Sequence, residues 1–105
     1  KLAEVVYKRA KLAQKAGCAG VICSGSEIKE IKKRCGPDFL TVVPGIRPDW
    51  AEVAGDDQQR VATPQRAIFD GADYLVVGRP IRTAPNPAAA ADRIGSDMTS
   101  AFSKA

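Results

Sequence analysis

The sequence contains no histidine, and its 105 residues include only three cysteines, one tryptophan and one methionine. The absence of histidine excludes an imidazole as a metal ligand or as a catalytic base. The cysteines Cys18, Cys23 and Cys35 are odd in number and lack the spacing of metal ligands, which favours free, mostly buried thiols in a reducing cytosol. We therefore expect neither a bound metal nor a disulfide framework.

Long apolar runs and an N-terminal signal peptide are also absent, so we expect a cytoplasmic protein without a membrane anchor. The net charge is a mild +4, and the basic residues concentrate at positions 1–15 and 29–34. No aromatic residues are interleaved with this charge, which indicates solvated helix surfaces rather than a nucleic-acid interface. The chain begins at Lys1 within a helical pattern and without an initiator methionine, so we expect that an N-terminal part is missing.

Apolar periodicity and turn residues predict strands that alternate with helices. The strands are continuously apolar, which is typical of a parallel sheet that helices cover, and hence of an α/β protein. A parallel sheet that closes into a barrel needs eight strands and about 250 residues, whereas this chain offers only three strands. We therefore do not expect the chain to be a stable monomer by itself. The predicted strands are 20–23, 39–43 and 74–77, and the predicted helices are 2–16, 24–34, 63–70 and one that starts at 86.

Local signals set the boundaries of these elements. Ser24 and Glu27 have the spacing of a capping box, and Thr63-Pro64 and Asn86-Pro87 each combine an N-cap residue with a proline at the first helical position. The connection over 44–60 is long for a compact domain, and such loops are usually functional or mobile.

Two strand ends carry an arginine. Arg79 follows Gly78 after the third strand, and Arg47 follows Pro44 and Gly45 after the second. Glycine lets the backbone approach an anion, and arginine supplies a forked, permanent cation, so both segments are candidates for binding one phosphate. The alternatives are a surface arginine for Arg79 and ordinary turn chemistry for Arg47.

Other polar residues near strand ends have weaker signals. Gln58 has an amide that is able to donate to the same phosphate, although a solvated loop residue is the default interpretation. Ser24 and Ser26 follow the first strand, where helix capping explains at least one of them. Asp56 and Asp57 suggest an acid–base pair, but neighbours in sequence rarely point the same way, so loop solubility is the simpler explanation.

Four blocks of this sequence together resemble the C-terminal part of bacterial orotidine 5′-phosphate decarboxylases, over about 12–94. Their order and spacing match that family, whereas a lone Gly-Arg pair is a weak signal. The blocks are the strand 20–24, Thr41-Val42-Val43-Pro44-Gly45-Ile46-Arg47-Pro48, Gly55-Asp56-Asp57-Gln58-Gln59-Arg60-Val61-Ala62-Thr63-Pro64, and Gly71-Ala72-Asp73-Tyr74-Leu75-Val76-Val77-Gly78-Arg79-Pro80-Ile81.

The resemblance implies a (β/α)8 TIM barrel in which residues 1–105 are the C-terminal portion of a single domain and supply the sixth to eighth strands. It implies conversion of orotidine 5′-phosphate to UMP in pyrimidine biosynthesis, without a metal or organic cofactor, by an enzyme that is usually a homodimer. The matching phosphate-binding positions are Arg47, Gln58, Gly78 and Arg79, and the loop that starts at Pro44 and Gly45 closes over the nucleotide.

One departure from the family pattern is large. The family's catalytic lysine lies in an Asp-x-Lys-x-x-Asp motif on the third strand, and no Asp-x-Lys occurs in this sequence. We therefore expect no catalytic residue within the chain and no activity from the chain alone. Two alternatives remain open: another phosphate-binding β/α barrel, such as one acting on ribulose or hexulose phosphates, and a non-catalytic assembly module that associates through its open sheet edges.

Overall fold

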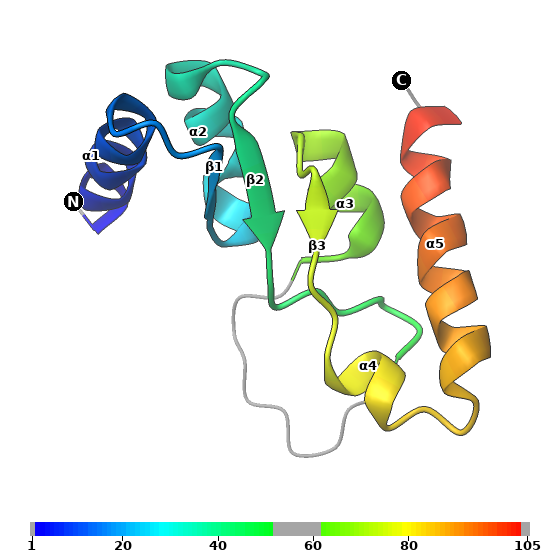
Figure 1. The fold of residues 1–105 in the computed structure, drawn as a ribbon. Helices are drawn as coiled ribbons and strands as arrows, with labels where there is room; N and C mark the ends of the chain where they lie inside the picture. The colour runs from blue at the N-terminus through cyan, green and yellow to red at the C-terminus, as the bar shows by residue number, and fades with distance from the viewer. Residues whose placement is uncertain (1, 52–61, 104–105) are drawn as a thin grey trace.

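A computed structural model describes residues 2–51 and 62–103 of the chain (Figure 1). Strands and helices alternate along it, as predicted, and a 3₁₀ turn and a short helix were not predicted as separate elements. In chain order the elements are α1 (Leu2–Lys15), β1 (Gly20–Ile22), the 3₁₀ turn η1 (Gly25–Glu27), α2 (Ile28–Cys35), β2 (Leu40–Val43), α3 (Pro64–Asp70), β3 (Tyr74–Leu75), α4 (Arg79–Arg82) and α5 (Pro87–Ser103).

The three strands form one parallel sheet in the order β1-β2-β3. Gly20 pairs with Leu40, and a Cβ at Gly20 would lie only 2.2 Å from the Leu40 carbonyl oxygen. Glycine is therefore required where β1 meets β2. Because parallel strands all point the same way, their carboxyl ends meet at a single edge of the sheet, which is where ligands bind in folds of this class.

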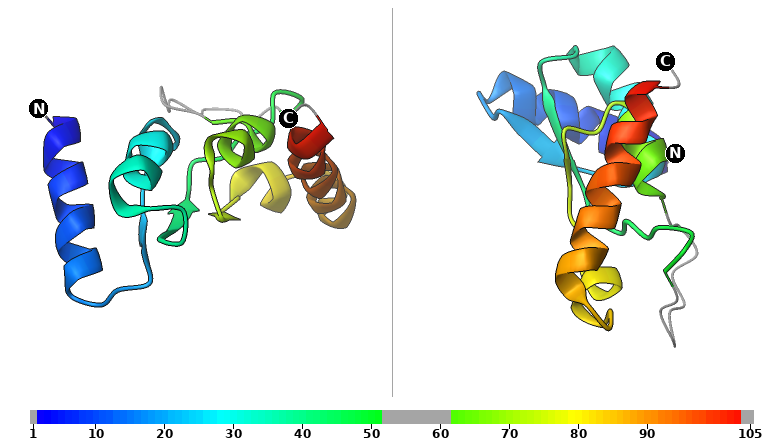
Figure 2. Two further views of the ribbon diagram at one scale, coloured as in Figure 1. Left: turned by 90° about the horizontal axis from the view of Figure 1, so that it is seen from above. Right: turned by 90° about the vertical axis from the view of Figure 1, so that its right-hand side faces the viewer.

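Helices α2 and α3 cover one face of the sheet, whereas the described residues leave the opposite face bare (Figures 1 and 2). The core lies under the helices, where Ile28, Ile31 and Val43 are fully buried. On the bare face, Ile22 and Tyr74 are 75% and 59% exposed, and both align with Val42 in the strand register. Apolar side chains that face solvent in this way indicate a surface made to be covered.

Several predicted boundaries are confirmed by hydrogen bonds. The Ser24 N–H donates to Glu27 Oε1 at 2.9 Å, the Thr63 hydroxyl accepts from the Arg66 N–H at 3.2 Å, and Asn86 Oδ1 accepts from the Ala89 N–H at 3.1 Å. These contacts satisfy backbone donors that a helix start leaves without an intrahelical partner.

Other boundaries were wrong in detail. The helix predicted over 24–34 is divided into η1 and α2. The strand predicted over 74–77 ends at Leu75, although the Val76 N–H still donates to the Val43 carbonyl at 2.9 Å. The backbone turns at Gly78 (φ −103°, ψ −101°), and the unpredicted helix α4 follows directly.

The amino edge of the sheet is held by a charged network. Asp73 Oδ2 accepts from Lys32 Nζ at 2.6 Å and from the Thr41 N–H at 2.9 Å. Lys32 also donates to the Pro37 and Phe39 carbonyls. Burial alone would raise the pKa of Asp73, but the hydrogen bonds from Lys32 and Thr41 outweigh it and lower that pKa. The network ties α2 to β2 and to the start of β3, away from the carboxyl edge.

Candidate functional site at the carboxyl edge of the sheet

The residues that follow β2 leave the sheet in a fixed path. Gly45 has φ 72°, a left-handed conformation that suits glycine. Ile46 then forms a parallel bridge with Ala62, and the Arg47 N–H donates to the Ala62 carbonyl at 2.9 Å. Arg47 is thus held by its backbone beside the residue that precedes the N-cap of α3, and its side chain is half-buried.

The residues that follow β3 place Arg79 at the first position of α4. Gly78 is the N-cap residue, and its carbonyl accepts from the Ile81 and Arg82 N–H groups, both at 3.0 Å. The Arg79 carbonyl accepts from the Thr83 N–H at 2.9 Å and from the Thr83 hydroxyl at 2.7 Å. Arg79 therefore has a rigid backbone, and its side chain is half-buried.

Space is left open at Gly78. A Cβ added there would meet no heavy atom of the described residues within 4 Å, apart from its chain neighbours. Packing by the described residues therefore does not account for a glycine at this position. Room for a ligand atom to approach the backbone is the physical property that glycine adds.

Because β2 and β3 are adjacent and parallel, Arg47 and Arg79 both follow the same edge of the sheet. The structure therefore brings together the two strand ends that the sequence singled out. Gln58, Asp56 and Asp57 lie outside the described residues. Pro44 follows β2 at the same edge and is exposed.

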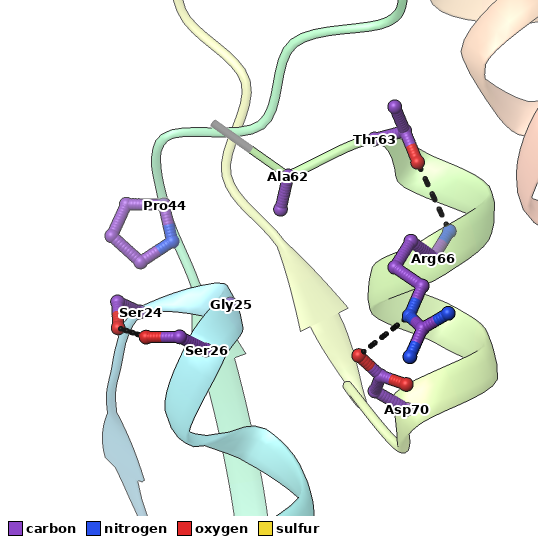
Figure 3. A pocket seen from close by; sticks show the side chains of 8 residues that line it. All are labelled: Ser24, Gly25, Ser26, Pro44, Ala62, Thr63, Arg66 and Asp70. Atoms are coloured by element: carbon purple, nitrogen blue, oxygen red, sulfur yellow. Dashed lines mark hydrogen bonds and ion pairs between the residues drawn. The ribbon is translucent and has the colours of Figure 1, made fainter. Parts of the chain in front are cut away.

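A neighbouring pocket opens between η1 and α3 (Figure 3). Pro44 is among its lining residues, whereas Arg47, Gly78 and Arg79 are not. Arg66 Nε donates to Asp70 Oδ2 at 3.1 Å within the pocket, and Lys29 Nζ lies 3.6 Å from Asp70 Oδ1. The lining residues are Ser24, Gly25, Ser26, Pro44, Ala62, Thr63, Arg66 and Asp70.

The polar residues after β1 make hydrogen bonds within their own turn. Ser24 caps η1 through its backbone, and the Ser24 and Ser26 hydroxyls lie 3.1 Å apart. The Arg66–Asp70 ion pair was not predicted, although its i,i+4 spacing on the helix after Thr63-Pro64 is a recognisable signal.

Gly25 is the first residue of η1 and lies close to Ala62, two positions before α3. A Cβ at Gly25 would come within 2.7 Å of the Ala62 Cβ. Ala62 is also the residue whose carbonyl holds the Arg47 backbone. Ala62 therefore lies close both to the turn after β1 and to the segment after β2.

Cys23 directly follows β1 and is unsuited to nucleophilic chemistry. Burial, with a smaller effect from the charge of Glu27, raises the pKa of the Cys23 thiol to about 11. A protonated, buried thiol is a poor nucleophile at neutral pH. Among the described residues, no group of cysteine, aspartate or glutamate side chains is placed to hold a metal ion. None of the described helices combines the length and apolar character of a membrane span.

The fold and its carboxyl edge define the class of protein: an α/β protein of the TIM-barrel type, represented here by three parallel strands and their helices. The chain belongs to the Orotidine 5′-phosphate decarboxylase / HUMPS family, whose sequence profile matches residues 1–94. The family resemblance expected from the sequence is thereby confirmed.

Individual relatives agree with this assignment. The orotidine 5′-phosphate decarboxylase of Geotalea daltonii is 54% identical over 95 residues, which are 90% of this chain and 39% of that protein. The crystal structure of the decarboxylase from Lactobacillus acidophilus has a TM-score of 0.78 at 41% identity, covering 92% of this chain and 38% of that one. That from Pyrococcus horikoshii has a TM-score of 0.69 at 28% identity, covering 91% and 42%. The chain thus spans about two fifths of the length of these relatives.

Proposed function

We propose that this chain is the phosphate-binding part of an orotidine 5′-phosphate decarboxylase, the enzyme that forms UMP in pyrimidine biosynthesis. The observation that carries the proposal is the position of Arg47 and Arg79 behind adjacent parallel strands. The relatives named as orotidine 5′-phosphate decarboxylases support the choice of substrate.

In this proposal the phosphate is held by two guanidinium groups and by backbone N–H groups near Gly78. Arginine is suited to this role because its planar fork donates two parallel hydrogen bonds to phosphate oxygens. The open space at Gly78 lets an oxygen approach the backbone. Gln58 adds an amide donor, and the loop that begins at Pro44 and Gly45 closes over the nucleotide.

The phosphate contacts contribute to catalysis at a distance. Loss of CO₂ leaves a carbanion on a ring carbon, which a nearby lysine stabilises and then protonates. Binding energy from a remote group such as the phosphate assists the reaction by fixing the substrate at that centre. The sequence has no Asp-x-Lys, so we assign the lysine to another part of the barrel and expect no turnover from this chain alone.

The bare sheet face fits the same proposal. Ile22, Tyr74 and Val76 become interior residues when the sixth, seventh and eighth strands are closed by the other five. We also assign the complete enzyme to the cytoplasm as a homodimer that uses no cofactor, binds no nucleic acid and has no membrane anchor.

The test is a chimeric barrel in which this chain replaces the matching 95 residues of the Geotalea daltonii enzyme. We expect it to decarboxylate orotidine 5′-phosphate, and Arg79→Ala to lower kcat/KM by about 10- to 100-fold through lost charge-assisted hydrogen bonds. Arg82→Ala is the matched control, because Arg82 is an exposed arginine on the same helix. A folded chimeric barrel without turnover would contradict the proposal and favour another phosphate-binding barrel.

A further inference from the structure

The segment after β2 also contains a turn that is not among the proposed substrate contacts. Pro48 is fully buried, and the Ala51 N–H donates to the Pro48 carbonyl at 3.1 Å, which closes a turn directly after Arg47. Trp50 lies in this turn and is the only tryptophan in the sequence.

Two side chains of α5 hold Trp50. The indole Nε1–H donates to Asp97 Oδ2 at 2.7 Å, and the Arg93 guanidinium carbon lies 4.4 Å from the centroid of the Trp50 ring. Arg93 and Asp97 are one turn apart on α5, so the indole is fixed both at its polar edge and across its face. We call these three residues the Trp50 clamp.

The clamp and the Ala62 contact hold Arg47 from both sides. Before the turn, the Arg47 N–H is bonded to the Ala62 carbonyl, and after it Trp50 is bonded to α5. A segment without regular secondary structure is thereby fixed at both ends. The backbone that carries the Arg47 side chain therefore has little freedom to move.

Helix α5 also packs against α4, the helix that begins with Arg79. The same helix therefore contacts both arginine-bearing segments, one through the clamp and one through α4. Figure 1 shows α5 running beside α3 and reaching α4 at its lower end. This arrangement makes α5 a common support for the two arginines.

We propose that Trp50, Arg93 and Asp97 are positioning residues, which act through Arg47 and set its place relative to Arg79 at the phosphate of the substrate. The inference rests on the proposed function, and it adds residues in the turn after Arg47 and on α5. Its signature is selective: the clamp strengthens binding of a nucleotide and leaves binding of the nucleoside without phosphate unchanged.

The experiment measures UMP and uridine affinity by calorimetry in the chimeric barrel. We expect Trp50→Phe and Asp97→Ala each to weaken UMP binding about fivefold, the effect of one side-chain hydrogen bond, with uridine affinity unchanged. The double variant should lose no more than either single variant, because both remove the same contact. Asp92→Ala is the control, since Asp92 is an exposed carboxylate on the same helix.

The outcomes separate the two proposals. Equal losses for UMP and uridine, or UMP affinity unchanged in both clamp variants, would overturn the clamp's role and leave the proposed function intact. An unsubstituted chimeric barrel that binds UMP no better than uridine would overturn the proposed function and the clamp's role together. Steady-state kinetics give a second readout, in which the clamp variants raise KM for orotidine 5′-phosphate.

Discussion

At the scale of single residues, Asp73 links stability to pH. Its folded-state pKa lies below the ordinary value, because hydrogen bonds from Lys32 and Thr41 outweigh the effect of burial. A carboxylate with a lowered pKa stabilises the fold at pH values above its unfolded pKa of about 4. This contribution is lost as the pH falls through the folded-state pKa.

We therefore expect Asp73→Asn to destabilise the chimeric barrel by about 1 kcal/mol at pH 7, because solvent screens the ion pair of the exposed Asp73 with Lys32. Urea unfolding between pH 3 and pH 7 measures this, and the difference from the unsubstituted protein should shrink below about pH 4. A difference that stays constant over that range would contradict the role of the Asp73 charge.

Gly25 offers a second test at the residue scale. A Cβ at this position would come within 2.7 Å of the Ala62 Cβ, so Gly25→Ala requires Ala62 to move. We expect a loss of about 1–3 kcal/mol from overpacking and weaker UMP binding, because the Ala62 carbonyl holds the Arg47 backbone.

The matched control for Gly25 is Gly95→Ala on the exposed side of α5. This change replaces glycine by the best helix former and should stabilise the protein by about 0.5–1 kcal/mol. Thermal unfolding and UMP calorimetry on both variants provide the comparison. Unchanged UMP affinity in Gly25→Ala would show that the contact at Ala62 does not transmit to Arg47.

At the scale of elements, α3 depends on its N-cap. The Thr63 hydroxyl accepts from the Arg66 N–H, and Pro64 begins the helix. We expect Thr63→Ala to cost about 1 kcal/mol, and Thr63→Ser to retain most of the stability because it keeps the acceptor oxygen. Urea midpoints of the two variants decide this, and equal losses would mean that the methyl group rather than the cap matters.

The element order was predictable from the sequence because its signals are local. Cap residues, prolines and glycines mark where helices start and stop, and continuous apolar runs mark buried parallel strands, so α1, β2 and α3 were close to their predicted ranges. Helix α4 was missed because four residues are too few to show helical periodicity. The end of β3 was misplaced because Val76 and Val77 are as apolar as the strand itself.

Only part of the candidate site could be predicted from the sequence. Strand ends that carry a glycine and an arginine single out Arg47 and Arg79 in the sequence, and the structure places these ends at one edge of the sheet. Their role in phosphate binding stays a prediction. The Trp50 clamp was not predictable, because 47 positions separate the indole from Asp97 and no local pattern joins them. Long-range contacts of this kind follow only from the packing of α5 against the rest of the fold.

At the scale of the whole molecule, the uncovered sheet face governs how the chain behaves by itself. We expect Ile22→Thr to have opposite effects in two contexts, since Ile22 is 75% exposed here and interior in the proposed barrel. In the isolated chain it should reduce self-association, measured by light scattering. In the chimeric barrel it should lower the free energy of unfolding by about 1–3 kcal/mol. Equal behaviour in both contexts would contradict the assignment of this face to a barrel interior.

The order of the strands in the sheet, β1-β2-β3, has a kinetic consequence. Each strand pairs with the next one along the chain, as Gly20 does with Leu40 and Val42 with Tyr74. These partners lie 20 and 32 positions apart in the sequence, so neither pairing requires an encounter between distant segments. During synthesis the described strands therefore emerge in the order in which they pair, and α5, whose Asp97 and Arg93 hold Trp50, emerges after all three.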